Sequence, residues 1–191
     1  MKTMEKTINS APYGVFKKKG IYLASYKANH PDHHIIYQDI NGKRDLGGDM
    51  MDIDLNPYDF IIATPPCNYY SKANYRRETS EYSQKTKHLL PSILKKLYEE
   101  FFDKPFIVEN VINNSLIPHD YDDKLFVYKA GGHTYWSNVL INVSDLEFEK
   151  QNKQNVWRGK RQGGINVHLV IEKFIQTVCS NNYTMLKKVN D

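Results

Sequence analysis

With 191 residues, 40% of them hydrophobic and 25% charged, the composition is that of a folded protein and excludes wholesale disorder. A chain of this length is large enough for a real core and predicts one compact domain, residues 1–191. The formal net charge of +4 permits nucleic-acid binding without requiring it, and the sequence contains neither an apolar run of membrane-spanning length nor the apolar centre of a signal peptide.

Residues 1–34 carry the weakest pattern in the chain. They include Gly14 in a polar, proline-containing context, but no clear apolar strand precedes it. One interpretation is an irregular N-terminal arm, and the other is a strand followed by a glycine turn.

Three histidines, His30, His33 and His34, invite a metal hypothesis because their spacing could place them on one helix face. No cysteine or carboxylate set of ligand spacing accompanies them, and Pro31 and Asp32 favour a turn. We therefore expect no metal site.

The first clear strand is predicted at residues 35–39, an apolar run that ends in Asp39 and is followed by Ile40. In doubly wound nucleotide-binding folds, an acid at this position accepts hydrogen bonds from ribose hydroxyls. A glycine pair then precedes Asp49 and Met50. For both acids, a local capping role beside a turn is the alternative.

The rest of the chain is organised around residues 58–71. The continuous apolar run at residues 60–62 predicts a buried strand of a parallel sheet, and Pro65 and Pro66 end it because neither can continue the hydrogen-bond ladder. Cys67 is then held on a stiff turn at the carboxyl end of a strand, where open α/β sheets bind ligands. A small apolar filler is the alternative for a lone cysteine.

The stretch that follows, residues 69–77, interleaves aromatic and basic side chains. This pattern suits simultaneous contact with phosphates and unstacked bases. A solvated surface loop explains it equally well.

A helix is predicted at residues 88–102, where apolar residues recur at helical spacing, and a second buried strand at residues 106–108 ends in Glu109. A helix between two buried strands forms a right-handed crossover and makes the strands parallel neighbours. Cys67 and Glu109 would then emerge at the same edge of the sheet. A thiol and a carboxyl group together suggest covalent catalysis, with Glu109 as an acid or hydrogen-bonding group.

Later strands are predicted at residues 124–130 and 139–143, separated by a glycine-containing stretch that includes His133. Residues 144–160 are polar and charged, as in a linker. The last element is a helix opening at residues 161–167, and its apolar face consists of Val167, Val170, Ile171, Phe174, Ile175 and Val178.

Two short motifs carry a resemblance to a known family. They are Thr64-Pro65-Pro66-Cys67-Asn68, followed by Ser71, and Glu109-Asn110-Val111. They resemble the Pro-Cys and Glu-Asn-Val motifs of DNA (cytosine-5) methyltransferases, most closely the compact, phage-type members. The similarity covers about residues 35–179 in patches. It implies an α/β fold of three-layer, Rossmann-like (methyltransferase-type) architecture, with a mostly parallel sheet and helices on both faces.

The resemblance also implies an activity. Cys67 would add to C6 of a cytosine extruded from DNA, Glu109 would bind the ring, and S-adenosylmethionine would give its methyl group to C5. The implied substrate-binding residues are Pro66, Asn68, Ser71, Arg76, Arg77, Asn110, Val111 and His133. The implied cofactor-binding residues are Gly14, Asp39, Ile40, Asp49, Met50, Pro65 and Asn166.

Two departures from the family leave other functions open. No Phe-x-Gly-x-Gly pattern surrounds Gly14, and both arginines of the family's Arg-x-Arg region are absent near His133, which could substitute as a donor. The alternatives are a catalytically degenerate methyltransferase-fold protein that binds DNA or a host restriction component, and an enzyme that modifies a base of a nucleotide or uses another one-carbon donor. A partner protein could supply the missing elements, and the chain has no room for a separate target-recognition domain.

Cys67 and Cys179 lie far apart in the sequence and are not a disulfide framework. A reducing cytosol is therefore expected, and the resemblance implies the cytoplasm of a bacterium or of a phage-infected host cell. No membrane association is expected.

Overall fold

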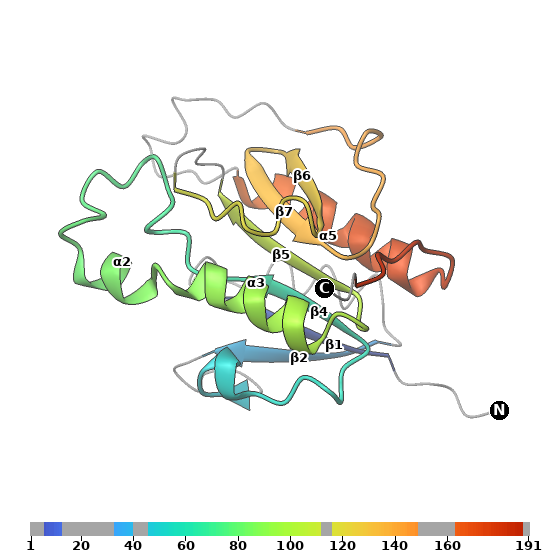
Figure 1. The fold of residues 1–191 in the computed structure, drawn as a ribbon. Helices are drawn as coiled ribbons and strands as arrows, with labels where there is room; N and C mark the ends of the chain where they lie inside the picture. The colour runs from blue at the N-terminus through green and yellow to red at the C-terminus, as the bar shows by residue number, and fades with distance from the viewer. Residues whose placement is uncertain (1–5, 13–32, 40–45, 112–115, 149–162, 189–191) are drawn as a thin grey trace.

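The computed structural model describes residues 6–12, 33–39, 46–111, 116–148 and 163–188, which form an α/β structure with one open sheet (Figure 1). The strands are β1 (Lys6–Pro12), β2 (His33–Asp39), β3 (Leu46–Gly47), β4 (Phe60–Thr64), β5 (Phe106–Val111), β6 (Phe126–Ala130) and β7 (His133–Ser137). The helices are the 3-10 turn η1 (Met50–Asp52), α2 (Glu81–Thr86), α3 (Leu89–Glu100) and α5 (Gly163–Cys179).

The strand order in the sheet is β3-β2-β1-β4-β5-β7-β6. Neighbouring strands from β3 to β5 are parallel, and β7 runs antiparallel to both β5 and β6. The chain builds β1, β2 and β3 outward in one direction and then continues with β4 on the other side of β1. The order therefore reverses between β1 and β4, and open α/β sheets bind their ligands outside the carboxyl ends of the strands at such a point.

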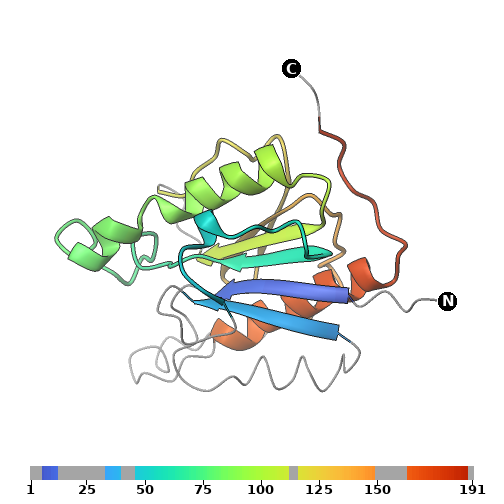
Figure 2. The same cartoon turned by 90° about the horizontal axis from the view of Figure 1, so that it is seen from below.

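The two faces of the sheet carry different helices. Figure 2 shows α3 on one side and α5 on the other. Along β4, Ile61 packs in the cluster formed with α3, whereas Phe60 packs in the cluster formed with α5, because successive strand residues face opposite sides. The Phe60 ring meets Phe174 of α5 edge-on, with centroids 5.9 Å apart.

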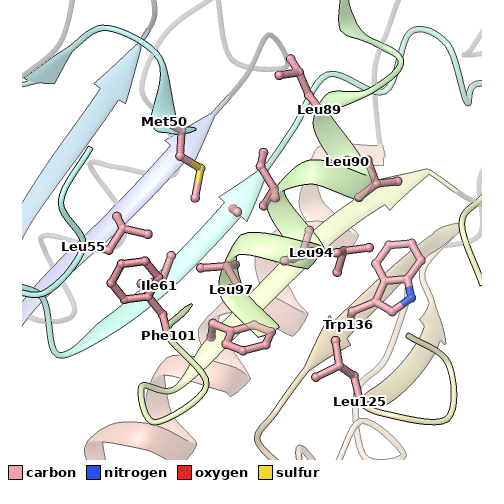
Figure 3. Close-up of a cluster of buried hydrophobic side chains, with 14 of the residues drawn as sticks. Met50, Leu55, Ile61, Leu89, Leu90, Leu94, Leu97, Phe101, Leu125 and Trp136 are labelled. Carbon is pink, nitrogen blue, oxygen red and sulfur yellow. The ribbon is translucent and has the colours of Figure 1, made fainter. Parts of the chain in front are cut away.

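The cluster below α3 is shown in Figure 3, where Leu90, Leu94 and Leu97 point toward the sheet residue Ile61 and toward Trp136 of β7. All five side chains are buried. At about 1.5–3 kcal/mol for each fully buried large apolar side chain, this packing supplies much of the stability that holds β4 and β5 side by side.

The elements predicted from strong local patterns are confirmed. The strand at residues 60–62 is β4, the helix at residues 88–102 is α3, and the strand at residues 35–39 is β2, which begins at His33. The predicted apolar face of α5 is also confirmed, since Val167, Val170, Phe174, Ile175 and Val178 are buried and Ile171 is partly buried against them.

The interpretation of the N-terminal segment as an irregular arm is wrong for residues 6–12. They form β1, which lies inside the sheet between β2 and β4. Its sequence is mostly polar, so the pairing with two neighbours decided the conformation rather than the hydrophobic pattern of the segment itself. His33 and His34 also lie in a strand, β2, and not on one helix face, while His30 falls outside the described residues.

The prediction of a strand at residues 139–143 is wrong, and the strand lies earlier, at β7. Gly131 and Gly132 have φ of 56° and 85°, and they make a two-residue turn that pairs Ala130 with His133. Two consecutive residues with positive φ are what a tight hairpin requires, and glycine adopts them without strain. Beyond β7, the strand pairing of Val139 is an isolated bridge to Met185.

A buried lysine fixes the turn η1. Lys96 of α3 is 7% exposed, and its ammonium donates to the carbonyl oxygens of Met50 (3.3 Å), Met51 (2.5 Å) and Ile53 (3.2 Å). An ammonium has three donors, so these three carbonyls satisfy it completely. The contact joins the segment after β3 to the helix that covers the sheet.

We expect Lys96→Met to lower the free energy of unfolding by about 1–3 kcal/mol, because the carbonyls lose their buried donor. The matched control is Lys95→Met, whose side chain is 64% exposed and lies 4.0 Å from Glu99, and which should change stability by less than about 0.5 kcal/mol. Urea unfolding followed by circular dichroism measures both. Equal unfolding midpoints for the two variants would show that the buried hydrogen bonds of Lys96 do not stabilise the fold.

None of the helices in the described part of the chain combines the length and apolar character required to span a bilayer.

Candidate active site

The carboxyl ends of β4 and β5 lie side by side and carry the two residues singled out for chemistry. The register pairs Ala63 with Val108, so the chain beyond each strand leaves the sheet at the same edge. Figure 2 shows the arrowheads of β4 and β5 on the side of the molecule where α2 lies. Cys67 and Glu109 are both brought to this edge, as the strand pattern predicted.

Cys67 stands on a short turn after β4. The strand ends at Thr64, Pro65 and Pro66 are buried, and Cys67 is half-buried. Its carbonyl oxygen accepts a hydrogen bond from Ser71 N at 2.8 Å, which closes the turn. The proline pair fixes two φ angles in succession, so the cysteine has little freedom to move away from the edge of the sheet.

Glu109 lies within β5 and not after it, because pairing with β7 carries the strand to Val111. The Glu109 side chain is 7% exposed, and its Oε1 lies 2.5 Å from His133 Nδ1, with His133 13% exposed. Tyr135 pairs directly with Glu109 across the two strands. Burial, aided by the charge of Glu109, raises the pKa of Tyr135 above its ordinary range, so its hydroxyl stays protonated.

Asn110 joins the two motifs physically. It is fully buried, and its Nδ2 donates to Pro65 O at 3.1 Å, while its Oδ1 accepts from Val111 N at 3.0 Å. The amide side chain is therefore engaged in holding the turn of Cys67 against the end of β5. Val111 is half-buried at the last position of that strand.

Side-chain hydrogen bonds hold the loop after the cysteine. Asn74 Nδ2 donates to Asn68 O (2.8 Å) and to Ser83 Oγ (2.9 Å), which ties the loop to α2. Arg77 donates from Nε to Asn74 O (3.1 Å) and from Nη2 to Ser71 O (2.9 Å). The guanidinium of Arg77 is therefore used within the loop.

Arg76 differs from its neighbour because it is exposed. Its guanidinium carbon lies 5.4 Å from the ring centroid of Tyr75, which is 84% exposed. Lys72 is also exposed in this loop. Together they present an aromatic face and positive charge on the outer side of the loop, a combination suited to single-stranded bases and phosphates.

Tyr70 fixes the same loop to the segment between α2 and α3. It is 3% exposed, and its hydroxyl donates to the carbonyl oxygen of Lys87, between α2 and α3. Burial, with Tyr69 close by, raises the pKa of Tyr70 to about 12, so the hydroxyl remains a donor at neutral pH.

The predicted cofactor residues lie partly at the neighbouring strand ends. Asp39 ends β2 and pairs with Gly47 of β3, and the next residues, Asp49 and Met50, lead into η1. Asp49 is half-buried, and its Oδ1 accepts from Met51 N at 3.0 Å, so this oxygen caps η1. Met50 is 2% exposed.

The remaining predicted cofactor residues are less well placed by the structure. Pro65 belongs to the turn already described, and its carbonyl oxygen is the acceptor for Asn110. Asn166 lies in the first turns of α5. Gly14 and Ile40 lie outside the described residues.

Sequence reasoning missed the residues that shape this site from a distance. Asn74 donates to the hydroxyl of Ser83 in α2, whereas Tyr70 and Lys96 donate to backbone carbonyl oxygens that are remote in the sequence. No local pattern distinguishes such residues from solvated polar side chains, and only the tertiary contacts identify them.

Comparison with known proteins gives one family. The model of the family described as C-5 cytosine-specific DNA methylase matches residues 16–125, which is more than half of the 191 residues. The matched span includes β2, β4, α3 and β5, and hence both Cys67 and Glu109. A search of curated proteins gives no match.

Proposed function

Because the chain belongs to the C-5 cytosine-specific DNA methylase family, we propose that it transfers a methyl group from S-adenosylmethionine to C5 of cytosine in DNA. The three-layer, Rossmann-like arrangement of methyltransferase type is part of this proposal. The reversal of strand order between β1 and β4, with a helix on each face of the sheet, supports it. We also propose that residues 1–191 form a single methyltransferase-like unit.

Cys67 is the proposed nucleophile. C5 of cytosine is a poor nucleophile, so the thiolate would add at C6, and the electron pair of the C5–C6 double bond would make C5 nucleophilic. The thiolate is the reactive form of cysteine, and positive charge nearby favours it. Lys72 and Arg76, exposed on the loop that follows, are the cations proposed for this role.

Glu109 is the residue that we propose binds the cytosine ring. It would hydrogen-bond N3 and the exocyclic amine of cytosine and stabilise the charge that develops on the ring during addition. Because Glu109 is 5% exposed, this contact would be made away from bulk water, where a hydrogen bond of this kind is stronger.

The residues at the neighbouring strand ends fit an adenosine moiety. Ribose hydroxyls and the adenine amino group are donors, and a carboxylate accepts from such groups. Asp39 is the last residue of β2, and Asp49 follows β3, the strand that pairs with β2. At the turn between these acids, Gly48 has a φ of +102° and open space within 4 Å of the position that a side chain would take. When bound, S-adenosylmethionine supplies the electrophilic methyl group. We propose that Asp39, Asp49 and Met50 hold it.

DNA binding is assigned to the loop between β4 and α2. A cytosine inside a duplex cannot reach Cys67, so the base must be flipped out of the helix. The exposed Tyr75 and Arg76 could then contact an unstacked base and a phosphate. Arg77 is proposed to act indirectly, by holding the loop in shape.

One observation favours the methyltransferase over the alternatives. The Asn110 amide bonds to Pro65 O at 3.1 Å and so couples the turn of Cys67 to the strand position next to Glu109. A buried filler cysteine would not require a polar bridge between these two segments, and the half-exposure of Cys67 also argues against that alternative.

The test is product analysis. The full chain is incubated with duplex DNA and methyl-labelled S-adenosylmethionine, and the DNA is digested to nucleosides. We expect labelled 5-methyldeoxycytidine, and no labelled product if the cofactor or the DNA is omitted.

The second candidate is a catalytically degenerate protein that binds DNA. It is favoured because the stretch similar to the family's Arg-x-Arg region lacks both arginines and forms β7, in which His133 is bonded to Glu109. Retained DNA binding without labelled product would support this candidate and contradict the methyltransferase.

A further inference from the structure

The contact between Glu109 and His133 is short and shielded from water. Oε1 and Nδ1 lie 2.5 Å apart, and the side chains are 7% and 13% exposed. The chain contains a second histidine–carboxylate contact, His119 with Asp122 at 2.7 Å, but there the side chains are 57% and 37% exposed. Shielding from solvent therefore separates the first pair from the second.

The hairpin dictates this contact. Val111 pairs with His133 and Glu109 pairs with Tyr135, so Glu109 and His133 are diagonal neighbours on the same face of two antiparallel strands. Diagonal positions are within reach of long or ring side chains. The tight turn at Gly131 and Gly132 makes His133 the first residue of β7 and places it at the edge of the sheet where Cys67 emerges.

We propose that His133 is a positioning residue that shares a proton with Glu109 and keeps that proton ready for N3 of the target cytosine. This inference rests on the proposed function. An imidazolium beside a carboxylate and a neutral imidazole beside a carboxylic acid differ only in where one proton lies between Nδ1 and Oε1. Both forms carry the proton that the ring requires.

The thiolate of Cys67 forms the S–C6 bond, the C5–C6 π pair moves to form C4=C5, and the C4=N3 π pair moves onto N3. N3 takes the shared proton, and the pair is left as neutral imidazole and carboxylate. The C4=C5 π pair then forms the bond from C5 to the methyl group, the bond between that methyl group and the sulfonium sulfur of the donor breaks to leave a neutral thioether, and the N3 lone pair restores C4=N3. The C5 proton is lost to solvent, its electron pair forms C5=C6 again, sulfur leaves as thiolate, and the N3 proton returns to Glu109 and His133. No oxidant is required, and the methyl donor is the one further reactant.

Few other ionisable groups described by the structure face this end of β5. Tyr135 stays neutral because burial raises its pKa, and Tyr128 of β6 does so for the same reason while donating its hydroxyl to Val139 O at 3.2 Å. Lys129 of β6 is exposed to solvent.

The other packed elements add little further charge here. Cys67 follows the neighbouring strand β4, and α5 covers the Glu109 face mainly with apolar side chains, with His168 and Glu172 half-buried. Among the described residues, Glu109 and His133 are thus the carboxyl group and the histidine that are in contact at this end of β5.

The test compares wild type, His133→Gln and the control His119→Gln in single-turnover methyl transfer across a range of pH. Wild type and His133→Gln should differ in how the rate depends on pH, because glutamine cannot take up and release the proton that the imidazole exchanges with Glu109. His119→Gln should follow the wild type.

A second readout needs no turnover. Proton and nitrogen NMR of the histidine rings should show a strongly deshielded Nδ1 proton for His133 that disappears in Glu109→Gln and persists in His119→Gln. Absence of this signal from the wild type would overturn the shared proton.

Coincident pH profiles for wild type and His133→Gln in an active enzyme would overturn this inference alone. A wild type that transfers no methyl group at any pH would overturn the proposed function, and this inference with it.

Discussion

Replacing Cys67 by serine is expected to abolish methyl transfer, with a rate loss on the order of 10⁴-fold or more. A serine hydroxyl is not ionised at neutral pH, so it cannot make the S–C6 bond that activates C5. Because Cys67 is half-buried on a turn fixed by two prolines, the smaller oxygen atom should leave the fold and the loop unchanged.

The measurement is a covalent trap. On DNA that contains 5-fluorocytosine, the C5 substituent cannot leave as a proton, so the wild type should remain attached to DNA in a denaturing gel when S-adenosylmethionine is present. Cys67→Ser should give no attached species but should bind the same DNA with similar affinity. Cys179→Ser is the matched control, because Cys179 ends α5 and is partly buried against the cluster below that helix. An adduct that persists in Cys67→Ser, or that is lost in Cys179→Ser, would show that a different nucleophile acts.

The second large effect is expected for Glu109→Gln, which should lower the single-turnover rate by about 10²–10³-fold, the usual consequence of removing one preorganised hydrogen-bonding group from a charge-stabilising site. Glutamine has nearly the same shape and can still bond to His133, so packing should be preserved. It cannot release a proton to N3, and its amide nitrogen is a donor at the position where glutamate has a second acceptor oxygen.

Pre-steady-state methyl transfer on duplex DNA measures this effect, and a binding assay on the same DNA should show little change. Glu100→Gln is the control, since Glu100 is exposed at the end of α3 and should retain the wild-type rate. If Glu109→Gln changed DNA affinity and left the rate of the bound complex intact, Glu109 would be a binding group and not a participant in the addition step.

The parts of the fold that the sequence predicted are those with strong local signals. The strand at β4 and the helix α3 follow from apolar runs and helical spacing, and two consecutive prolines locate the end of β4 without further information. Once these elements are parallel neighbours, Cys67 and Glu109 must come to one edge. The direction of the strands and the right-handed crossover between them are enough to predict this placement.

The parts that were missed depend on contacts between remote segments. The strand β1 is polar in sequence and becomes a strand because β2 and β4 pair with it on both sides. The place of β7 follows from the positive φ of Gly131 and Gly132, whereas the apolar residues 139–143 indicated a strand only by composition. In each case, tertiary pairing overrode the propensity of the segment.

Individual side chains of the site show the same limit of prediction from sequence. Arg76 and Arg77 are equivalent by type and position in a pattern, yet one is exposed beside Tyr75 and the other is bonded to Ser71 O and Asn74 O. His133 was expected to contact the substrate, and the structure places its Nδ1 against Glu109, a contact that the sequence did not predict. A sequence pattern predicts which side chains lie at an edge of the sheet, but it does not predict which of them form hydrogen bonds with one another.

The hydrogen bonds of Asn74 and Arg77 have a thermodynamic consequence for encounter with DNA. Fixing the backbone of one residue costs about 1–2 kcal/mol of conformational entropy, and a loop whose turns already exist has met that cost during folding. Association would then be limited chiefly by unstacking and unpairing of the target cytosine, which is a cost borne by the nucleic acid. A mismatched or single-stranded cytosine carries less of that penalty, so such sites should be favoured over fully paired ones.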